Sequence, residues 1–237
     1  MERCEEGRVA PRSLIRLQNW LSPAFPIGSY SYSHGLEWAI GANRVHDRPS
    51  LVDWLDADLR YGSGRNDAIF FVETWRCAAR ADLAGLIETA ELAAAFRGTA
   101  ELALEASQQG TACFATLREV WPEPVIDALI EAAEQRAIRP VLPLVIAVRS
   151  ATERIPVGTA LRAFLYAFVS NLVTAGVRLI PLGQTDGQRA LAELEGAVLE
   201  ASERALSAGI DQLGSAALMV DVASILHESQ YTRLFRS

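Results

Sequence analysis

Apolar residues recur along this chain with the period of an α-helix, and the alternation typical of β-strands is nearly absent. The clearest case follows Pro156, which suits the first turn of a helix. Apolar side chains then fall three, four, seven and eleven positions apart, at Leu161, Phe164, Leu165, Phe168 and Leu172. This spacing places them in one stripe and predicts a central helix with little solvent contact.

The same period predicts roughly ten helices joined by short connections. The longer ones are expected over residues 83–96, 99–120, 125–137, 141–150, 185–209 and 215–228. No repeat, bland linker or low-complexity tract interrupts them. We therefore expect an all-α fold, a single-domain bundle that spans residues 1–237.

Several side chains predict where helices begin and which faces they bury. Thr185 and Gln188 have the spacing of a capping box, so a helix is expected to start near Thr185. Asn66 and Asp82 are the types of residue that cap a helix start. For the last helix, residues 215–228, the buried face is predicted to contain Leu218, Val222 and Ile225.

Two stretches do not follow the helical pattern. One is the front loop, residues 22–33 (SPAFPIGSYSYS), with two prolines and a glycine. The other is the tail, residues 229–237 (SQYTRLFRS), which is polar and aromatic without a helix signal. Segments that break the local pattern often carry function. We expect residues 1–12 to be a flexible N-terminus and residues 229–237 to be a partner-binding tail.

Composition excludes several function classes. The 237 residues carry a net charge of −7, and the sequence contains no lysine. A P-loop and a Schiff-base enzyme both need a lysine. Without a basic excess, binding to nucleic acid or to an anionic membrane is not expected.

Cys4, Cys77 and Cys113 lack metal-site spacing and fit a reducing cytosol. No signal peptide is visible, and the apolar run at 163–177 is short for a bilayer, so we expect a soluble cytoplasmic protein.

Two constellations could carry metal chemistry, although each has a simpler structural explanation. His34 and Glu37 stand three apart and would share a helix face, which makes His34 a weak candidate for a metal ligand. Asp53 and Asp56, in the sequence DWLDAD, resemble the paired acids that hold magnesium in some all-helical enzymes. Local hydrogen bonding and a solvated helix face are the alternatives.

A polar turn and the tail are candidates for partner contacts. The turn GQTDGQ presents Gln184, Asp186 and Gln188 at the start of a predicted helix. In the tail, arginines alternate with residue types that are enriched in binding hot spots, namely Tyr231, Arg233, Leu234, Phe235 and Arg236. The alternatives are an ordinary helix connection and a frayed end.

Three blocks together resemble the UreF family of urease accessory proteins. They are residues 17–40 (LQNWLSPAFPIGSYSYSHGLEWAI), 171–191 (NLVTAGVRLIPLGQTDGQRAL) and 221–237 (DVASILHESQYTRLFRS). The resemblance implies an all-α fold and a homodimer. It also implies a chaperone-like scaffold that bridges UreD (also called UreH) and the GTPase UreG, and through them reaches the urease apoprotein for nickel insertion.

The resemblance also implies roles for single residues. Pro26, Gly28 and Glu37 would face UreG, together with Arg178 and the polar turn, whereas the tail would bind UreD. Relatives usually have Lys where Arg178 stands, a second Gly where Ser29 stands and Gln where His34 stands. Arg keeps the charge of Lys but not its geometry.

We thus predict a protein that is not an enzyme and has no cofactor, in which nickel is passed on. Three histidines and three scattered cysteines do not suffice for a tight carrier site. Two alternatives stay open. One is a regulator that activates or gates the GTPase UreG, with an arginine placed at the nucleotide. The other is an unrelated magnesium-dependent helical enzyme that uses Asp53 and Asp56.

Overall fold

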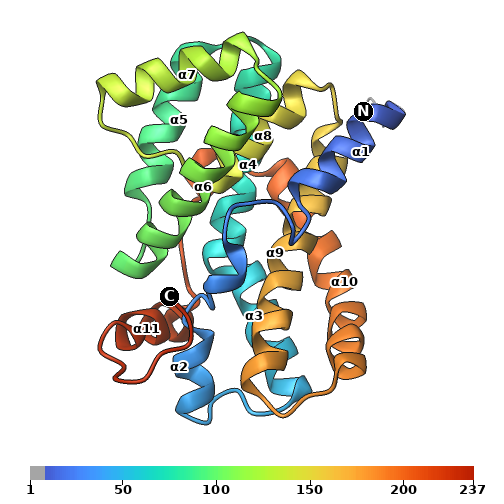
Figure 1. Cartoon of the computed structure of the whole chain (residues 1–237), viewed down its shortest axis with the longest axis vertical. Helices are drawn as coiled ribbons and strands as arrows, with labels where there is room; N and C mark the ends of the chain where they lie inside the picture. Colours follow the sequence, from blue (N-terminus) through green and yellow to red (C-terminus); the bar gives the residue numbers. More distant parts are fainter. Residues whose placement is uncertain (1–8) are drawn as a thin grey trace.

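The structure is a computed structural model that describes residues 9–237. Over this range the chain forms eleven α-helices and two short 3₁₀ turns, with no strand (Figure 1). The all-α class predicted from the sequence is confirmed. Residues 1–8, which include Cys4 and most of the expected flexible N-terminus, lie outside the described range. Residues 11 and 12 already belong to the first helix.

The helix bounds agree closely with the periodicity in the sequence. The elements are α1 (Pro11–Trp20), α2 (Leu36–Gly41), α3 (Arg48–Tyr61), α4 (Ser63–Ala79), α5 (Leu83–Ala95), α6 (Ala100–Val120), α7 (Pro124–Gln135), α8 (Leu142–Thr152), α9 (Val157–Leu179), α10 (Gln184–Ser207) and α11 (Leu218–His227). The 3₁₀ turns are η1 (Ser29–Ser31) and η2 (Ile210–Gln212).

Helix α4 is central and packs against α3, α5, α8, α9 and α10 (Figure 1). Helices α5, α6 and α7 gather toward one end of the molecule, and α2 and α11 lie side by side nearer the other end. The stripe predicted on α9 is confirmed, since Leu161, Phe164, Leu165 and Leu172 are buried in the main core. Phe168 is partly buried beside that core.

Helix α9 is the one described helix long and apolar enough to cross a membrane by length and composition. It has 23 residues, so it is longer than the 15-residue apolar run in the sequence suggests. Half of its most apolar window is buried within the protein. Its neighbours are α2, α3, α4, α8 and α10, so a core helix explains its composition.

The helix start expected near Thr185 is confirmed to within one residue, but two of the three predicted side-chain caps are wrong. Helix α10 begins at Gln184 with Gly183 as its N-cap and no side-chain cap, so Thr185 already lies in the first turn. Helix α4 begins at Ser63, and the Asn66 amide oxygen instead accepts a hydrogen bond from the Gly214 N–H. Asp82 caps α5 as predicted, by accepting from the Gly85 N–H.

The predicted buried face of the last helix is also wrong. Leu218 and Ile225 are exposed, whereas Val220, Ala223, Ser224 and His227 face the domain. The reason is a close approach of α2. A Cβ on Gly35 would lie 2.8 Å from the Ser224 backbone nitrogen, so only small residues fit between the two helices. Gly35 also has a φ of 77°, which favours glycine.

Candidate functional site

The tail folds back onto the domain and is held there by a buried carboxylate. Glu37, on α2, accepts hydrogen bonds from two tail N–H groups, that of Leu234 at 2.7 Å and that of Phe235 at 2.9 Å. The Phe235 side chain is buried at 4% exposure, and Glu37 itself is 7% exposed. A carboxylate that is hidden from water and bonded to the backbone fixes the path of the chain, because an unpaired buried charge is costly.

His227, at the end of α11, lies between two carboxylates. Its Nδ1 is 2.7 Å from Glu101 Oε2, and its Nε2 is 3.1 Å from Glu37 Oε2. The other oxygen of Glu101 accepts from Arg233 Nη1, in the tail, at 2.8 Å. Helices α2, α6 and α11 are therefore joined to the tail through one set of charges.

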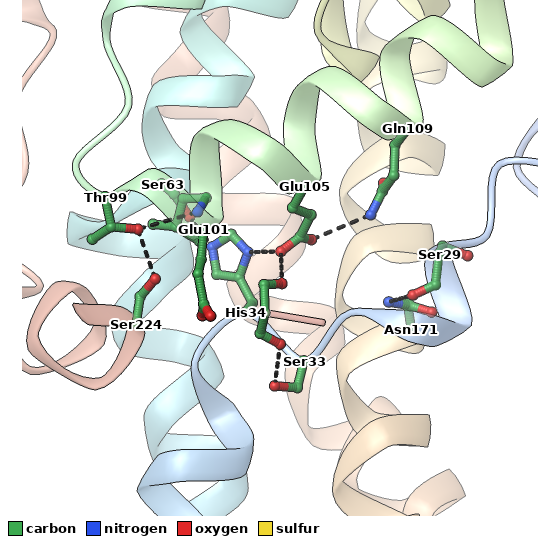
Figure 2. Close-up of polar contacts among 12 residues, drawn as sticks. Ser29, Ser33, His34, Ser63, Thr99, Glu101, Glu105, Gln109, Asn171 and Ser224 are labelled. Atoms are coloured by element: carbon green, nitrogen blue, oxygen red, sulfur yellow. Dashed lines mark hydrogen bonds and ion pairs between the residues drawn. The ribbon is translucent and has the colours of Figure 1, made fainter. Parts of the chain in front are cut away.

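His34, directly after the front loop, forms a second buried link to α4 and α6 (Figure 2). Its Nδ1 lies 3.3 Å from Glu105 Oε2, and its Nε2 lies 2.6 Å from the Ser63 hydroxyl. Asp58 is 3.8 Å from the same Nε2. Burial by itself lowers the pKa of His34, but the charges of Glu105 and Asp58 and the bond to Glu105 outweigh it and raise the pKa to about 9. His34 is thus an imidazolium at neutral pH.

The tail is also joined directly to the front loop. The Ser237 hydroxyl donates to Glu105 Oε2 at 2.7 Å. The Ser237 backbone oxygen accepts from the N–H of Ser33 at 2.7 Å and from its hydroxyl at 2.5 Å. The Arg236 N–H donates to the Ser31 carbonyl at 2.8 Å. Segments some 200 positions apart in the sequence therefore run side by side.

Arg178, near the end of α9, bridges the front loop and the tail on the outside of this contact. Its Nη1 donates to the Tyr30 carbonyl at 2.9 Å, and its guanidinium lies 4.4 Å from the centre of the Phe235 ring. Stacking on an aromatic ring suits the planar guanidinium of arginine better than the ammonium of lysine. The structure therefore brings Arg178, the front loop and the tail into one surface.

The other residues predicted to contact partners lie outside the contact between Arg178, the front loop and the tail. Pro26 is exposed in the front loop, and Gly28 has a φ of 70°, a conformation that favours glycine. Gln184 and Gln188 are exposed at the start of α10, where Asp186 pairs with Arg189 at 2.8 Å. The front loop therefore adjoins the tail, and the polar turn is exposed at the start of α10.

Two sequence-based expectations need correction. Glu37 is not a surface residue, because the tail covers it and uses both of its oxygens. His34 and Glu37 do not share a helix face either. Helix α2 begins at Leu36, and His34 stands before it with a φ of 59°. Both ring nitrogens of His34 already have protein partners, so neither nitrogen is available to bind a metal ion.

Among the described residues, the remaining metal candidates do not come together in a site. Asp56 pairs with Arg60 at 2.7 Å, while Asp53 is exposed. Within residues 9–237, no group of three or more His, Cys, Asp or Glu side chains has a geometry that could hold a metal ion. Cys77 and Cys113 are buried. Burial, followed by the charge of Glu73, raises the pKa of the Cys77 thiol to about 11, so it stays protonated at neutral pH.

Sequence reasoning missed Glu101, Glu105 and the role of His227. A signal was present for the first two, because Glu101 and Glu105 stand four apart on one face of the helix predicted over 99–120. Both are buried, at 7% and 8% exposure. His227 had no such signal, since its partners Glu37 and Glu101 are 190 and 126 positions away in the sequence.

Next to the tail, α11 turns apolar side chains outward. Leu218 is 70% exposed, Ile225 51%, Met219 44% and Leu226 39%. In the tail itself, Tyr231 and Leu234 are also exposed. An exposed group of large apolar side chains beside a charged segment is typical of a protein-binding surface. We call the outward side chains of α11 the α11 apolar face.

Comparison with known proteins gives a consistent result. The family model described as UreF matches residues 45–195. The urease accessory protein UreF of Rhodopseudomonas palustris strain BisB5 is 50% identical over 225 residues, which cover 95% of this chain and 91% of the relative. The UreF of Bradyrhizobium diazoefficiens is 47% identical over 234 residues, with 98% and 96% coverage. That of Granulibacter bethesdensis is 45% identical over 225 residues, with 95% and 94% coverage.

Proposed function

The chain belongs to the UreF family of urease accessory proteins and so has a role in urease maturation; on that premise we propose that it is a non-catalytic scaffold for nickel insertion. It bridges UreD and the GTPase UreG, acts in the cytoplasm as a homodimer, and passes nickel on to the urease apoprotein rather than holding it as a cofactor. The observation that supports a scaffold most directly is the joining of the front loop, Arg178 and the tail at one surface.

We assign UreD to the tail and the α11 apolar face. Burial of the exposed parts of Leu218 and Ile225 against a partner would gain about 1–2 kcal/mol for each side chain. Arg233 and Arg236 flank this surface, and arginine is enriched in binding hot spots. A tail that is already held by Glu37 and Glu101 loses less conformational freedom on binding than a free one would.

We assign UreG to the front loop, Arg178 and the polar turn of Gln184, Asp186 and Gln188. In this arrangement Glu37 acts indirectly, by fixing the tail against which Arg178 stacks. The Arg178 guanidinium is committed to Tyr30 and Phe235. It therefore contributes as part of a rigid surface rather than as an arginine inserted at the nucleotide.

The experiment that tests this scaffold is a pull-down of the full chain with tagged UreD and, separately, with the UreD–UreG pair. Ile225→Glu should abolish capture by UreD, because it places a charge within the α11 apolar face. Leu199→Glu is the matched control, since Leu199 on α10 is 52% exposed and should tolerate the same change. Both variants should keep the circular dichroism of the wild type.

The same variants test the proposed function in cells. Urease activation in cells that lack this chain should be restored by the wild type and by Leu199→Glu, but not by Ile225→Glu. Capture of UreD by Ile225→Glu at wild-type strength would contradict the assigned surface. Full urease activity without the chain would contradict the scaffold itself. Single-turnover GTP hydrolysis by UreG that this chain accelerates, with the acceleration lost in Arg178→Ala, would instead establish the activator.

A further inference from the structure

The connection from α10 to α11, residues 208–217, crosses the junction of α3 and α4 and is hydrogen-bonded to it. The Ala216 N–H donates to the Tyr61 carbonyl at 2.8 Å, and the Gly214 N–H donates to the Asn66 amide oxygen at 3.1 Å. Only three residues of the connection, those of η2, have regular structure. Fixing such a segment costs conformational entropy, which contacts from outside the segment have to offset.

Arg65, in the first turn of α4, supplies two further bonds to this connection. Its Nη2 donates to the Gln212 carbonyl at 2.6 Å, and its Nη1 donates to the Gly214 carbonyl at 3.2 Å. Within residues 9–237, Arg65 forms no ion pair with a carboxylate. Hydrogen bonds from a charged donor are stronger than those between neutral groups, and the planar fork of arginine can reach two acceptors at once.

The start of α11 depends on this connection more than its end does. At the end of the helix, His227 is bound by Glu37 and Glu101. At the start, the N-cap residue is Ala217, and no side chain caps the helix there. Leu218, the most exposed member of the α11 apolar face, follows directly. The path of the connection therefore determines where this end of the face lies.

We propose that Arg65 is a positioning residue for partner binding: by holding the connection, it fixes the α11 apolar face in the orientation that binds UreD. This inference rests on the proposed function, since it takes UreD as the partner of that face. Arg65 acts through the two carbonyls and needs no contact of its own with the partner. Without it, the connection moves more freely in the unbound chain, and binding of UreD has to restrict that freedom again.

The test is a titration of tagged UreD with the full chain, which gives a Kd for each variant. Arg65→Met removes both donors and should raise Kd at least fivefold. Arg76→Met is the matched control, because Arg76 Nη2 also donates from α4 to a backbone carbonyl, that of Leu206 in α10, at 2.7 Å. This control should lose similar stability in urea, yet keep a Kd within twofold of the wild type. Arg65→Lys keeps the charge but reaches one carbonyl at a time, so its Kd should be intermediate.

A second measurement does not involve the partner. Amide hydrogen exchange at Gly214 and Ala216 reports on the connection in the unbound chain, since both N–H groups are bonded to the α3–α4 junction. Exchange at these two positions should be at least fivefold faster in Arg65→Met and unchanged in Arg76→Met. Exchange as slow in Arg65→Met as in the wild type would overturn the inference.

The outcomes separate this inference from the proposed scaffold. If the wild type binds UreD and Arg65→Met binds it equally well, or if Arg76→Met loses as much affinity, the inference is wrong and the scaffold stands. Failure of the wild type to bind UreD would contradict both. Should Arg65→Met not fold, Arg65→Lys decides, and a Kd equal to that of the wild type would count against the role of the two-carbonyl contact.

Discussion

At the scale of single residues, the main feature of this protein is a set of buried carboxylates that accept hydrogen bonds from the tail. Glu37, Glu101 and Glu105 are all less than 9% exposed, yet each accepts a hydrogen bond from the tail. Buried charges of this kind contribute little net stability when paired, and their main effect is to make one arrangement much better than others. They explain how a segment without secondary structure keeps a defined path.

Glu37→Ala is expected to lower the free energy of unfolding by about 2–4 kcal/mol, because it leaves two tail N–H groups and the Nε2 atom of His227 without their partner. Urea denaturation measures the loss, and amide hydrogen exchange at Leu234 and Phe235 should become faster. The control is Glu195→Ala, at an exposed position of α10, which should change stability by less than about 0.5 kcal/mol. Equal effects of the two substitutions would contradict the role given to Glu37.

The buried imidazolium of His34 makes stability depend on pH. Its folded-state pKa of about 9 lies above the ordinary value of 6.5, so its contribution is complete below pH 6.5 and is lost as the pH rises through 9. The loss is on the order of 3 kcal/mol across this window. We expect the free energy of unfolding in urea to fall between pH 6.5 and 9.

Two variants separate this effect from general alkaline destabilisation. His34→Gln should flatten the pH dependence, since the neutral amide keeps hydrogen bonds without a titrating group. His46→Gln should keep the wild-type slope, because His46 is exposed at 55%. A slope in His34→Gln as steep as in the wild type would show that another group titrates.

At the scale of the elements, close backbone approach decides how the helices pack. Gly110, in the middle of α6, lies directly against the chain entering α8. A Cβ at this position would stand 2.2 Å from the Pro140 carbonyl oxygen, which cannot move like a flexible side chain. In the sequence, Gly110 is a glycine in the middle of a long predicted helix, where glycine lowers the stability of the helix. In the structure it is the point that lets α6 and α8 meet.

Two glycine-to-alanine substitutions should therefore have opposite signs. Gly110→Ala should destabilise the protein by about 1–3 kcal/mol through overpacking. Gly196→Ala, in α10 with nothing within 4 Å of the new Cβ, should stabilise it by about 0.5–1 kcal/mol through helix propensity. Thermal and urea unfolding of the two variants measure both changes. Stabilisation by Gly110→Ala would mean that α6 and α8 are less close than described.

At the scale of the whole molecule, the tail joins parts of the chain that are far apart in the sequence. It touches α2, α6, α9 and the front loop, and it ends beside α11 (Figure 1). In the proposed scaffold, the surface for UreD and the surface for UreG thus share one segment. The tail is a structural part of the fold as well as a proposed contact.

Deletion of residues 230–237 should leave the far-ultraviolet circular dichroism nearly unchanged, because the tail contains no helix. The free energy of unfolding should nevertheless fall by about 2–4 kcal/mol, since burial of Phe235 is lost together with the partners of Glu37 and Glu101. Tyr231→Ala is the control, as this side chain is fully exposed and should have no effect on stability. A truncated chain as stable as the wild type would mean that the tail is only loosely attached.

Four features could be predicted from the amino-acid sequence alone: the helical class, the apolar stripe of α9, the cap at Asp82 and the family. These features depend on periodicity, capping and motifs, and each of those is formed by residues that are close together in the sequence. Three other features follow only from how the helices pack: the outward face of α11, the burial of Glu37 and the contact of Arg178 with the tail. Each depends on partners more than 50 positions away, and the side-chain pattern of one helix carries no information about which neighbour approaches it, or how closely.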